Sequence, residues 1–350
     1  MIVSTLKLRL NKKQESTLDG WLWNLTSVYN WGLRKIELNA QNNIYFSKFA
    51  FVNLLADHGK KLDIPSHTIQ GVLSQVYTAW QRCFKKIGGK PRLKGVRNKL
   101  NSISFPDRIY PPKENHISIP GIGKVRYHKQ EIPKGTIKNG RIIKRASGWY
   151  LCLFIDSQRE PIVCTGNGQV GIDPGFKSLL TLSTGEKIEH PRELEKAAKR
   201  LAQAQRGHDL ALASRIQERI ANQKKDRNHK LSLRLVKENK LIAFSKDNIK
   251  GIAKKFGKSV SSSGHNQLRQ FIAYKSSSCD RRFVEIDSKN STRTCSLCGA
   301  LSGPQGWAGL PVRFWDCACG ASTHDRDINA ARNVLKAAVG ATVEVQHAAA

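Results

Sequence analysis

Two cysteine pairs, Cys295-Ser-Leu-Cys298 and Cys317-Ala-Cys319, decide how the C-terminal part of this sequence folds, and eighteen residues separate them. Pairs at this spacing are typical of a ribbon in which four thiolates surround one tetrahedral Zn²⁺. The second pair is Cys-x-Cys, so that half of the ribbon is tighter than usual. Two disulfides or four unrelated thiols are the alternatives, and the spacing favours zinc. The predicted ligands of one structural Zn²⁺ are Cys295, Cys298, Cys317 and Cys319.

Two acids follow the cysteines in His324-Asp-Arg-Asp327-Ile-Asn-Ala-Ala331, where the run of small residues predicts the start of a helix. A carboxylate at a helix start is often only a cap that the helix dipole favours. Asp325 fits that role. Asp327 becomes a candidate metal ligand if other carboxylates converge on it.

The charge of the chain indicates a polyanionic partner. Its 350 residues include 59 Lys and Arg but only 27 Asp and Glu, which gives a formal net charge of +32. This charge exceeds what solubility requires and predicts nucleic acid as the partner. A membrane is not expected, because no apolar run approaches about 18 residues and residues 1–10 alternate like a strand instead of a signal peptide. Eight cysteines, half of them in the two pairs, suit a reducing cytosol, so we expect a cytoplasmic protein.

The N-terminal part of the chain predicts one strand and then helices, which start at about Lys12 and continue over 47–58 and 67–86. A basic stretch broken by Gly and Pro follows, and it cannot form one helix. A solvated linker is the alternative for this stretch, but its cations and free amides favour contact with phosphates. The candidate nucleic-acid-binding residues are Lys85, Lys86, Lys90, Arg92, Lys94, Arg97 and Lys99.

Short strands separated by Gly and Pro from about 101 to 160 predict a small β-barrel, which the first strand can join from a distance. After a linker the pattern changes to three strands, a long basic helical stretch, a strand, a helix, a strand and a closing helix. This is the RNase H-like order. The expected elements are three strands between 170 and 190, helix 191–239 interrupted near Gly207, strand 241–247, helix 262–280, strand 282–287 and helix 328–337.

The first of these strands, Val170-Gly-Ile-Asp173-Pro-Gly, ends in an acid and a turn. An RNase H-like nuclease holds two divalent metals, usually Mg²⁺, between carboxylates at neighbouring strand ends and on the last helix. Mg²⁺ prefers hard oxygen ligands, so at least three carboxylates are expected. Asp173 and Asp327 stand at two of these places, although an Asp that caps the Pro-Gly turn is the alternative for Asp173.

Three motifs together resemble the transposon-encoded TnpB family, which is related to the type V CRISPR effectors: Gly171-Ile-Asp173-Pro-Gly, Thr294-Cys-Ser-Leu-Cys298-Gly and His324-Asp-Arg-Asp327-Ile-Asn-Ala-Ala-Arg-Asn. The resemblance covers essentially the whole chain and implies a multidomain α+β protein. It also implies a guide RNA, a double-stranded DNA target beside a short recognised motif, and specificity that comes mostly from RNA pairing. The implied domains are a wedge-like β-barrel (1–11 and 88–160), a helical recognition lobe (12–87), an RNase H-like (RuvC-like) nuclease domain (165–290 and 323–340), a zinc-ribbon insertion (291–322) and a flexible tail (341–350).

One position departs from the family. Most members carry Glu-Asp-Leu-Asn at the end of the fourth strand, and the expected glutamate falls here on Ser245, whose hydroxyl cannot supply the missing charge. Glu285 is the first candidate to replace it, because it lies on the fifth strand, beside the fourth, to which the family resemblance implies this glutamate can relocate. An ordinary exposed strand residue is the alternative. Asp247 is the second candidate, since it shares a strand face with Ser245, and Asp287, which more simply caps a turn, is the third.

These residues predict a Mg²⁺-dependent, RNA-guided DNA endonuclease in which Asp173, Glu285 and Asp327 hold two Mg²⁺ ions. Ser245 supports an alternative, a nuclease-inactive RNA-guided DNA-binding protein that represses transcription. A strand-transferring transposase is a weaker third hypothesis, because no additional assembly of acids or tyrosine for that reaction is recognised.

Overall fold

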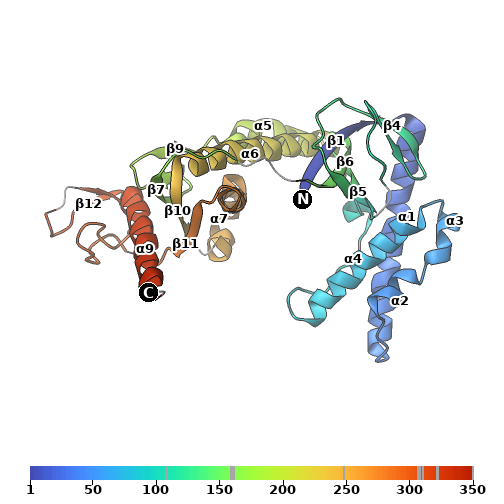
Figure 1. The fold of residues 1–350 in the computed structure, drawn as a ribbon, viewed down its shortest axis with the longest axis horizontal. Helices are drawn as coiled ribbons and strands as arrows, with labels where there is room; N and C mark the ends of the chain where they lie inside the picture. The colour runs from blue at the N-terminus through green and yellow to red at the C-terminus, as the bar shows by residue number, and fades with distance from the viewer. Residues whose placement is uncertain are drawn as a thin grey trace. The chain divides into compact units, whose positions relative to one another are not determined.

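The computed structural model describes residues 1–106, 109–157, 162–246, 249–305, 309, 311–320 and 323–348, without the side chains of 249, 250, 252, 253, 255 and 341–348. The chain separates into two compact units, Met1–Arg159 and Glu160–Ala350 (Figure 1). Within the described residues, no helix is both long enough and apolar enough to cross a membrane.

Six strands form the sheet of the first unit in the order β2-β5-β6-β1-β4-β3, and all neighbours are antiparallel. Strand β1 pairs with β6 and β4, which follow it only after the helices of the unit, so the first strand does join the later ones from a distance. The edge strands β2 and β3 are not paired with each other in the described ranges, so the closed barrel stays a prediction. The strands are β1 (Ile2–Arg9), β2 (Ser102–Phe105), β3 (His116–Ile119), β4 (Gly123–Tyr127), β5 (Thr136–Arg145) and β6 (Gly148–Asp156).

The longest helix of the first unit, α1 (Lys12–Gln41), begins with a capping box. The Asn11 side chain accepts the Gln14 N–H at 2.8 Å, and the Gln14 side chain accepts the Asn11 N–H at 3.2 Å. The buried face of α1 packs against α4 (Ser66–Phe84), and Trp21 lies in that core. The expected helix over 47–58 is interrupted. The shorter segments are α2 (Lys48–Asn53), η1 (Ala56–His58), α3 (Gly59–Leu62) and η2 (Val96–Asn98).

Five strands form the main sheet of the second unit in the order β11-β10-β7-β8-β9. Strands β7, β10 and β11 are parallel, whereas β8 and β9 are antiparallel to their neighbours. The predicted RNase H-like order of elements is therefore present. The strands are β7 (Gly168–Pro174), β8 (Ser178–Leu182), β9 (Lys187–Glu189), β10 (Asn239–Lys246) and β11 (Arg282–Asp287), with a separate pair, β12 (Phe314–Trp315) and β13 (His324–Asp325).

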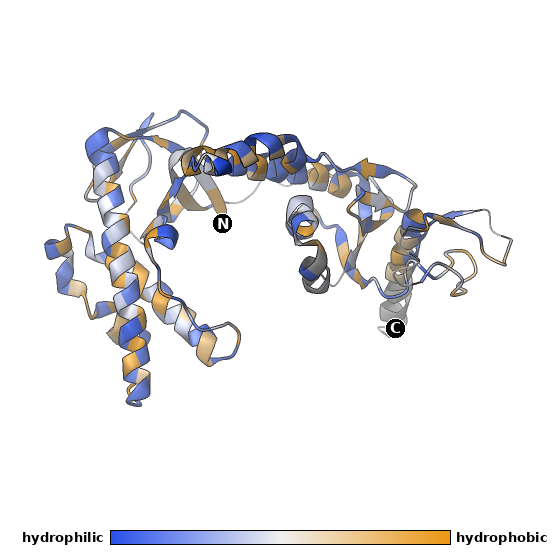
Figure 2. Cartoon of the chain, turned by 180° about the vertical axis from the view of Figure 1, so that it is seen from behind, coloured by the Kyte–Doolittle hydropathy of each residue, from blue (hydrophilic) through white to orange (hydrophobic). Residues whose placement is uncertain are grey.

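Helices α5 (Glu193–Arg206) and α6 (Leu210–Glu238) form a hairpin that breaks at Gly207, as predicted. Its small apolar core is built from Leu201, Ala204, Ala213 and Ile216. Figure 2 shows the hairpin as predominantly hydrophilic, which fits a helix pair that is held together mainly along one narrow seam.

Helix α8 (His265–Ser277) corresponds to the helix expected over 262–280, and it is preceded by α7 (Ile249–Ser263), which was not predicted. Gly264 between them has a φ of 72°, which glycine adopts without strain and which interrupts a helix. The last helix, α9 (Arg326–Ala348), continues through most of the expected flexible tail. We attribute this to its alanine-rich sequence, since alanine has the highest helix propensity.

Helices cover both faces of the main sheet, and strand alternation assigns each residue to one of them. Phe244 and Ile172 belong to one apolar cluster with Leu268 of α8. Ala243 points the other way and packs against Val334 of α9. These two sides of the sheet are called the α8 face and the α9 face.

Helix α9 lies directly on strand β7 at Gly171. A Cβ atom at this residue would lie 2.0 Å from the Ala331 carbonyl oxygen and 2.9 Å from the Leu335 Cβ. Both separations are shorter than a side chain tolerates, so glycine is required for the strand and the helix backbone to approach this closely.

We expect Gly171→Ala to lower the free energy of unfolding by about 2–3 kcal/mol, because the added methyl group must push α9 off the sheet. Urea unfolding measures this loss. The control is Gly340→Ala on the same helix, where a Cβ meets nothing within 4 Å and the change should be neutral or slightly stabilising. Equal stability of the two variants would contradict the close contact.

His265 at the start of α8 ties this helix to the sheet. Its Nε2 lies 3.0 Å from the Leu179 carbonyl oxygen, so Nε2–H is the donor. Burial lowers the pKa of His265 to about 4, and the nearby His190 and Arg227 lower it further, against the hydrogen bond to Leu179. The folded protein therefore favours the neutral imidazole.

The unfolded state binds a proton at His265 below a pH of about 6.5, whereas the folded state binds it only near pH 4. His265 should therefore weaken the fold as the pH falls through this window, by about 3 kcal/mol in total. In urea unfolding, the stability advantage of the wild type over His265→Gln should shrink from pH 7 to pH 4, because glutamine keeps a donor but does not titrate. A difference that is constant with pH would contradict this.

Candidate active site and metal centre

Asp173 and Asp327 lie at the same level on the α9 face. Asp173 follows Gly171 by two strand positions, about 6.6 Å, and shares its face. Asp327 precedes Ala331 by four helical positions, about 6 Å. Because Gly171 contacts Ala331, the two acids are level with each other if the helix and the strand run in opposite directions.

An ion pair fixes that direction. Asp173 pairs in register with Thr181 of β8, and Thr181 pairs with Lys187 of β9. The Lys187 ammonium lies 2.6 Å from a carboxylate oxygen of Asp325, at the start of α9. The start of α9 is therefore at the Asp173 end of β7, and the structure brings Asp173 and Asp327 to the same edge of the sheet.

Asp325 caps the helix, as its position in the sequence suggests. Its Oδ1 accepts the N–H groups of Asp327 and Ile328, each at 3.1 Å. Burial raises the pKa of Asp325, but the Lys187 ammonium and the two amides outweigh burial, and the pKa is lowered overall. Asp327 itself lies 3.6 Å from the Arg313 guanidinium, so a cation already accompanies this carboxylate.

Ser245 occupies the third position of the same constellation. Phe244 pairs with Ile172, so the next residue, Ser245, lies opposite Asp173, and it shares a face with Ala243, which packs against α9. The side chain is 2 % exposed, and its Oγ has no hydrogen-bond partner among the described residues. A buried hydroxyl without a hydrogen-bond partner costs folding free energy, so Ser245 Oγ remains available for a polar contact.

Glu285 lies on the opposite face from Asp173. It alternates with Val284 and Ile286, which pack beside α9, and its Oε2 accepts a hydrogen bond from Arg269 of α8 at 2.7 Å. The structure therefore does not bring Glu285 together with Asp173 and Asp327. Asp287 accepts the Lys289 N–H at 3.0 Å and caps the following turn. Asp247 lies outside the described residues.

Among the described residues, the ligand atoms of Cys295, Cys298, Cys317 and Cys319 form the only group of three or more metal-ligating side chains, and they lie within 4.8 Å of one another. The Cys298–Cys317 and Cys295–Cys319 sulfur atoms are 3.6 and 3.9 Å apart. A disulfide requires about 2.05 Å, whereas tetrahedral Zn–S bonds of about 2.3 Å place sulfurs about 3.8 Å apart. The geometry thus fits a metal and excludes the alternative of disulfides.

Hydrogen bonds also favour a thiolate at Cys317. The Ser302 hydroxyl donates to its Sγ at 3.1 Å. This donor, together with the Cys319 amide, lowers the pKa of Cys317 to about 6, and the thiolate is the form that binds a metal.

Two residues that the sequence did not single out connect the cysteines to α9. His324 Nε2 lies 3.2 Å from Cys295 Sγ, and its ring packs on Trp315 at 4.6 Å between centroids. Asn329 is 1 % exposed; its side chain accepts the Ser296 N–H and donates to the Thr294 carbonyl, both at 2.8 Å. The only sequence signal for these two contacts was the position of His324 and Asn329 in the His-Asp-Arg-Asp-Ile-Asn motif.

The predicted nucleic-acid-binding stretch packs partly along α1 of the first unit. Asn30 exchanges two hydrogen bonds with the backbone of Lys94, at 2.7 and 2.8 Å. Lys90 forms an ion pair with Glu37, so the positive charge of this candidate is already neutralised within the protein. Lys94 is half-buried, and the other five candidates are exposed: Lys85, Lys86, Arg92, Arg97 and Lys99.

Two family models match the second unit and its border. One, described as a probable transposase, matches residues 153–255, and the other, described as a Cas12f1-like TNB domain, matches residues 265–334. Neither covers half of the chain.

Curated relatives match over most of their length. A "Putative RNA-guided DNA endonuclease" of Streptomyces pristinaespiralis is 30% identical over 300 residues, which cover 80% of this chain and 73% of the relative. The "Putative RNA-guided DNA endonuclease InsQ" of Escherichia coli (strain K12) is 24% identical, over 79% of this chain and 75% of the relative.

A solved structure shares the fold. A chain in the cryo-EM structure of a Cas12f1–sgRNA–target DNA complex matches with a TM-score of 0.56 at 14% identity, over 92% of this chain and 82% of that one. The protein therefore has a Cas12f-like, multidomain α+β fold.

Proposed function

The chain belongs to the TnpB family of transposon-encoded proteins, and from that premise we propose that it is an RNA-guided DNA endonuclease. It binds a guide RNA and cleaves matched double-stranded DNA beside a short motif, with base pairing supplying most of the specificity. The observation that carries this proposal is the position of Asp173 and Asp327 at one edge of the sheet. A protein that only binds DNA has no chemical need for both acids.

The donor set suits Mg²⁺. One or two carboxylates, completed by water and substrate phosphate, commonly hold this ion. Bound there, Mg²⁺ would activate water and stabilise the leaving oxygen of a phosphodiester. Asp173 and Asp327 supply the oxygens, and Lys187 holds the start of α9 in place through Asp325. The second Mg²⁺ of a two-metal site lacks its usual third carboxylate at Ser245.

That missing charge favours a second candidate function, a nuclease-inactive RNA-guided DNA-binding protein that acts as a repressor. The specific observation is that Ser245 is buried opposite Asp173, where no carboxylate of the described chain replaces it. For Glu285 to serve as the third ligand, it would have to leave Arg269 and cross to the other face of the sheet.

For the four cysteines we propose one structural Zn²⁺, because the sulfur separations match tetrahedral Zn–S bonds. His324 would then donate a hydrogen bond to the Cys295 thiolate and link the metal centre to the start of α9.

Cys295→Ser should remove the metal, because three thiolates and a hydroxyl bind Zn²⁺ far more weakly than four thiolates. Metal analysis of the purified protein should find one Zn²⁺ per chain in the wild type and none in the variant. The control Cys83→Ser, in the first unit, should keep its Zn²⁺. A full equivalent of Zn²⁺ in Cys295→Ser would rule out the four-thiolate site.

Cleavage separates the two candidate functions. With its co-expressed RNA, the wild type should cut matched duplex DNA in Mg²⁺, and Asp173→Ala should bind the DNA but not cut it. Ser245→Glu should raise the cleavage rate by about tenfold or more, since it adds the charge opposite Asp173, whereas the uncharged Ser245→Gln should not. Cutting by Ser245→Glu alone would establish the second candidate.

Glu285→Gln tests the remaining acid in the same assay. We expect cleavage to persist, because the carboxylate faces α8 and contacts Arg269. Loss of cleavage with intact DNA binding would instead make Glu285 the third metal ligand, as the sequence predicts.

A further inference from the structure

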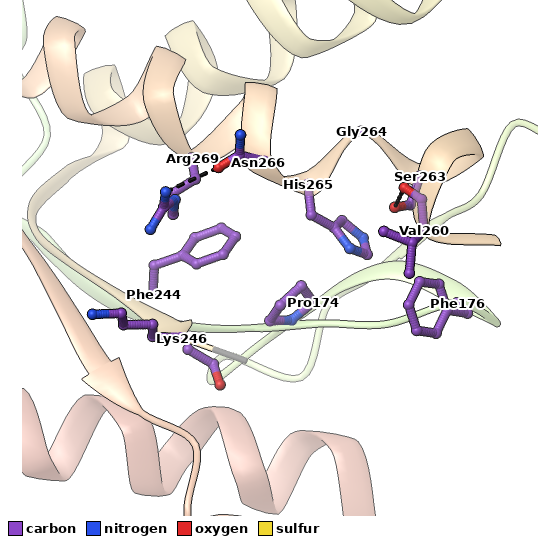
Figure 3. A pocket seen from close by; sticks show the side chains of 11 residues that line it. Pro174, Phe176, Phe244, Lys246, Val260, Ser263, Gly264, His265, Asn266 and Arg269 are labelled. Atoms are coloured by element: carbon purple, nitrogen blue, oxygen red, sulfur yellow. Dashed lines mark hydrogen bonds between the residues drawn. The ribbon is translucent and has the colours of Figure 1, made fainter. Parts of the chain in front are cut away.

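A cavity of about 100 Å³ opens beside the candidate active site, on the α8 face of the sheet (Figure 3). Its walls are largely apolar and aromatic. Pro174, which directly follows Asp173, forms one side with Phe244 of β10, and the rings of His265 and Phe176 form another. These two rings lie 5.7 Å apart between centroids. Phe176 is 42 % exposed, so its ring is open to a ligand.

Polar groups stand at the rim and have unused hydrogen-bonding capacity. Arg269 is held by Glu285 at 2.7 Å and by Asn266 at 2.9 Å, but its buried Nε has no partner among the described residues. Arg269 therefore keeps one N–H donor for a further acceptor.

The exposed Lys246 adds a positive charge to the rim. A flat ring fits this combination of walls and rim, because aromatic side chains stack on it while Asn and Arg hydrogen-bond its edge. A closed cavity of about 150 Å³ accepts benzene. This cavity is smaller, at about 100 Å³, but it is open, so it can take a single ring that lies partly outside it and no larger ligand. A nucleobase has this shape, and lysine is well suited to contact the phosphate attached to it.

We propose that this cavity binds one base of the DNA strand that is cut, next to the phosphate at Asp173 and Asp327. The inference rests on the proposed function, since it assumes that DNA reaches this edge of the sheet. Pro174 connects the two places: its side chain lines the cavity on the α8 face, and the preceding Asp173 points to the α9 face. One strand that crosses the ends of β7 and β10 can therefore contact both.

Photocrosslinking tests the proposal without depending on cleavage. The RNA-bound protein carries Asp173→Ala, so that the DNA stays intact, and the matched duplex carries 5-iodouracil at one thymine position at a time. We expect a crosslink at one or two neighbouring DNA positions, which mass spectrometry places on Phe176 or His265. Phe176→Ala should reduce the crosslink at that position at least fivefold. The control Phe256→Ala, 47 % exposed in α7 and outside the cavity lining, should not.

A second measurement uses the cutting protein. An abasic site at the crosslinked position should slow cleavage about as much as Phe176→Ala does, and the two changes together should slow it no further. The assignment of the cavity would be overturned if the DNA crosslinked only to the guide RNA, or if Phe176→Ala left the crosslink unchanged. It would also be overturned if the abasic site and Phe176→Ala slowed cleavage additively. None of these outcomes would contradict the proposed function. Failure of the protein to form any RNA-guided DNA complex would overturn both.

Discussion

The close contact between strand β7 and helix α9 at Gly171 is the constraint on which the second unit depends. A side chain there would overlap the Ala331 carbonyl, and moving the helix outward would move Asp327 away from Asp173. The same helix anchors the cysteine centre through Asn329 and meets β9 through the Lys187–Asp325 ion pair. The absence of a side chain at Gly171 thus keeps α9 at the position where Asp327 is level with Asp173 and where Asn329 contacts the cysteine segment.

The start of α9 concentrates several interactions in one turn. Asp325 receives two backbone amides and an ammonium, while Asp327 lies near the Arg313 guanidinium. His324, one residue earlier, reaches Cys295. Loss of metal from the cysteines would therefore disturb not only the cysteine segment but also the carboxylate that we propose for catalysis, although that residue binds no zinc.

The order of the strands, the pairing of the first strand, the break of the long hairpin at Gly207 and the cluster of four cysteines were predictable, because each has a local signal of periodicity, turn residues or spacing. Helix α7 was not predicted. The face of Glu285 was not. Strand β11 carries Phe283, Val284 and Ile286 around it, so it is apolar on both sides and alternation alone does not orient it. Only the packing of α8 and α9 against the sheet shows which face Glu285 lies on. His324 and Asn329 were missed because their role depends on contacts that are distant in sequence.

Strand β1 has a consequence for how the protein is made. It pairs with β6 across nearly the whole length of the first unit, so these hydrogen bonds cannot form until β6 has left the ribosome. At about 5–20 residues per second, the newly made strand waits roughly 7 to 30 seconds for that partner. During this interval the edge that faces β6 is unpaired, and the alternation of Lys7 and Arg9 with apolar residues supplies the charges that discourage pairing with other chains.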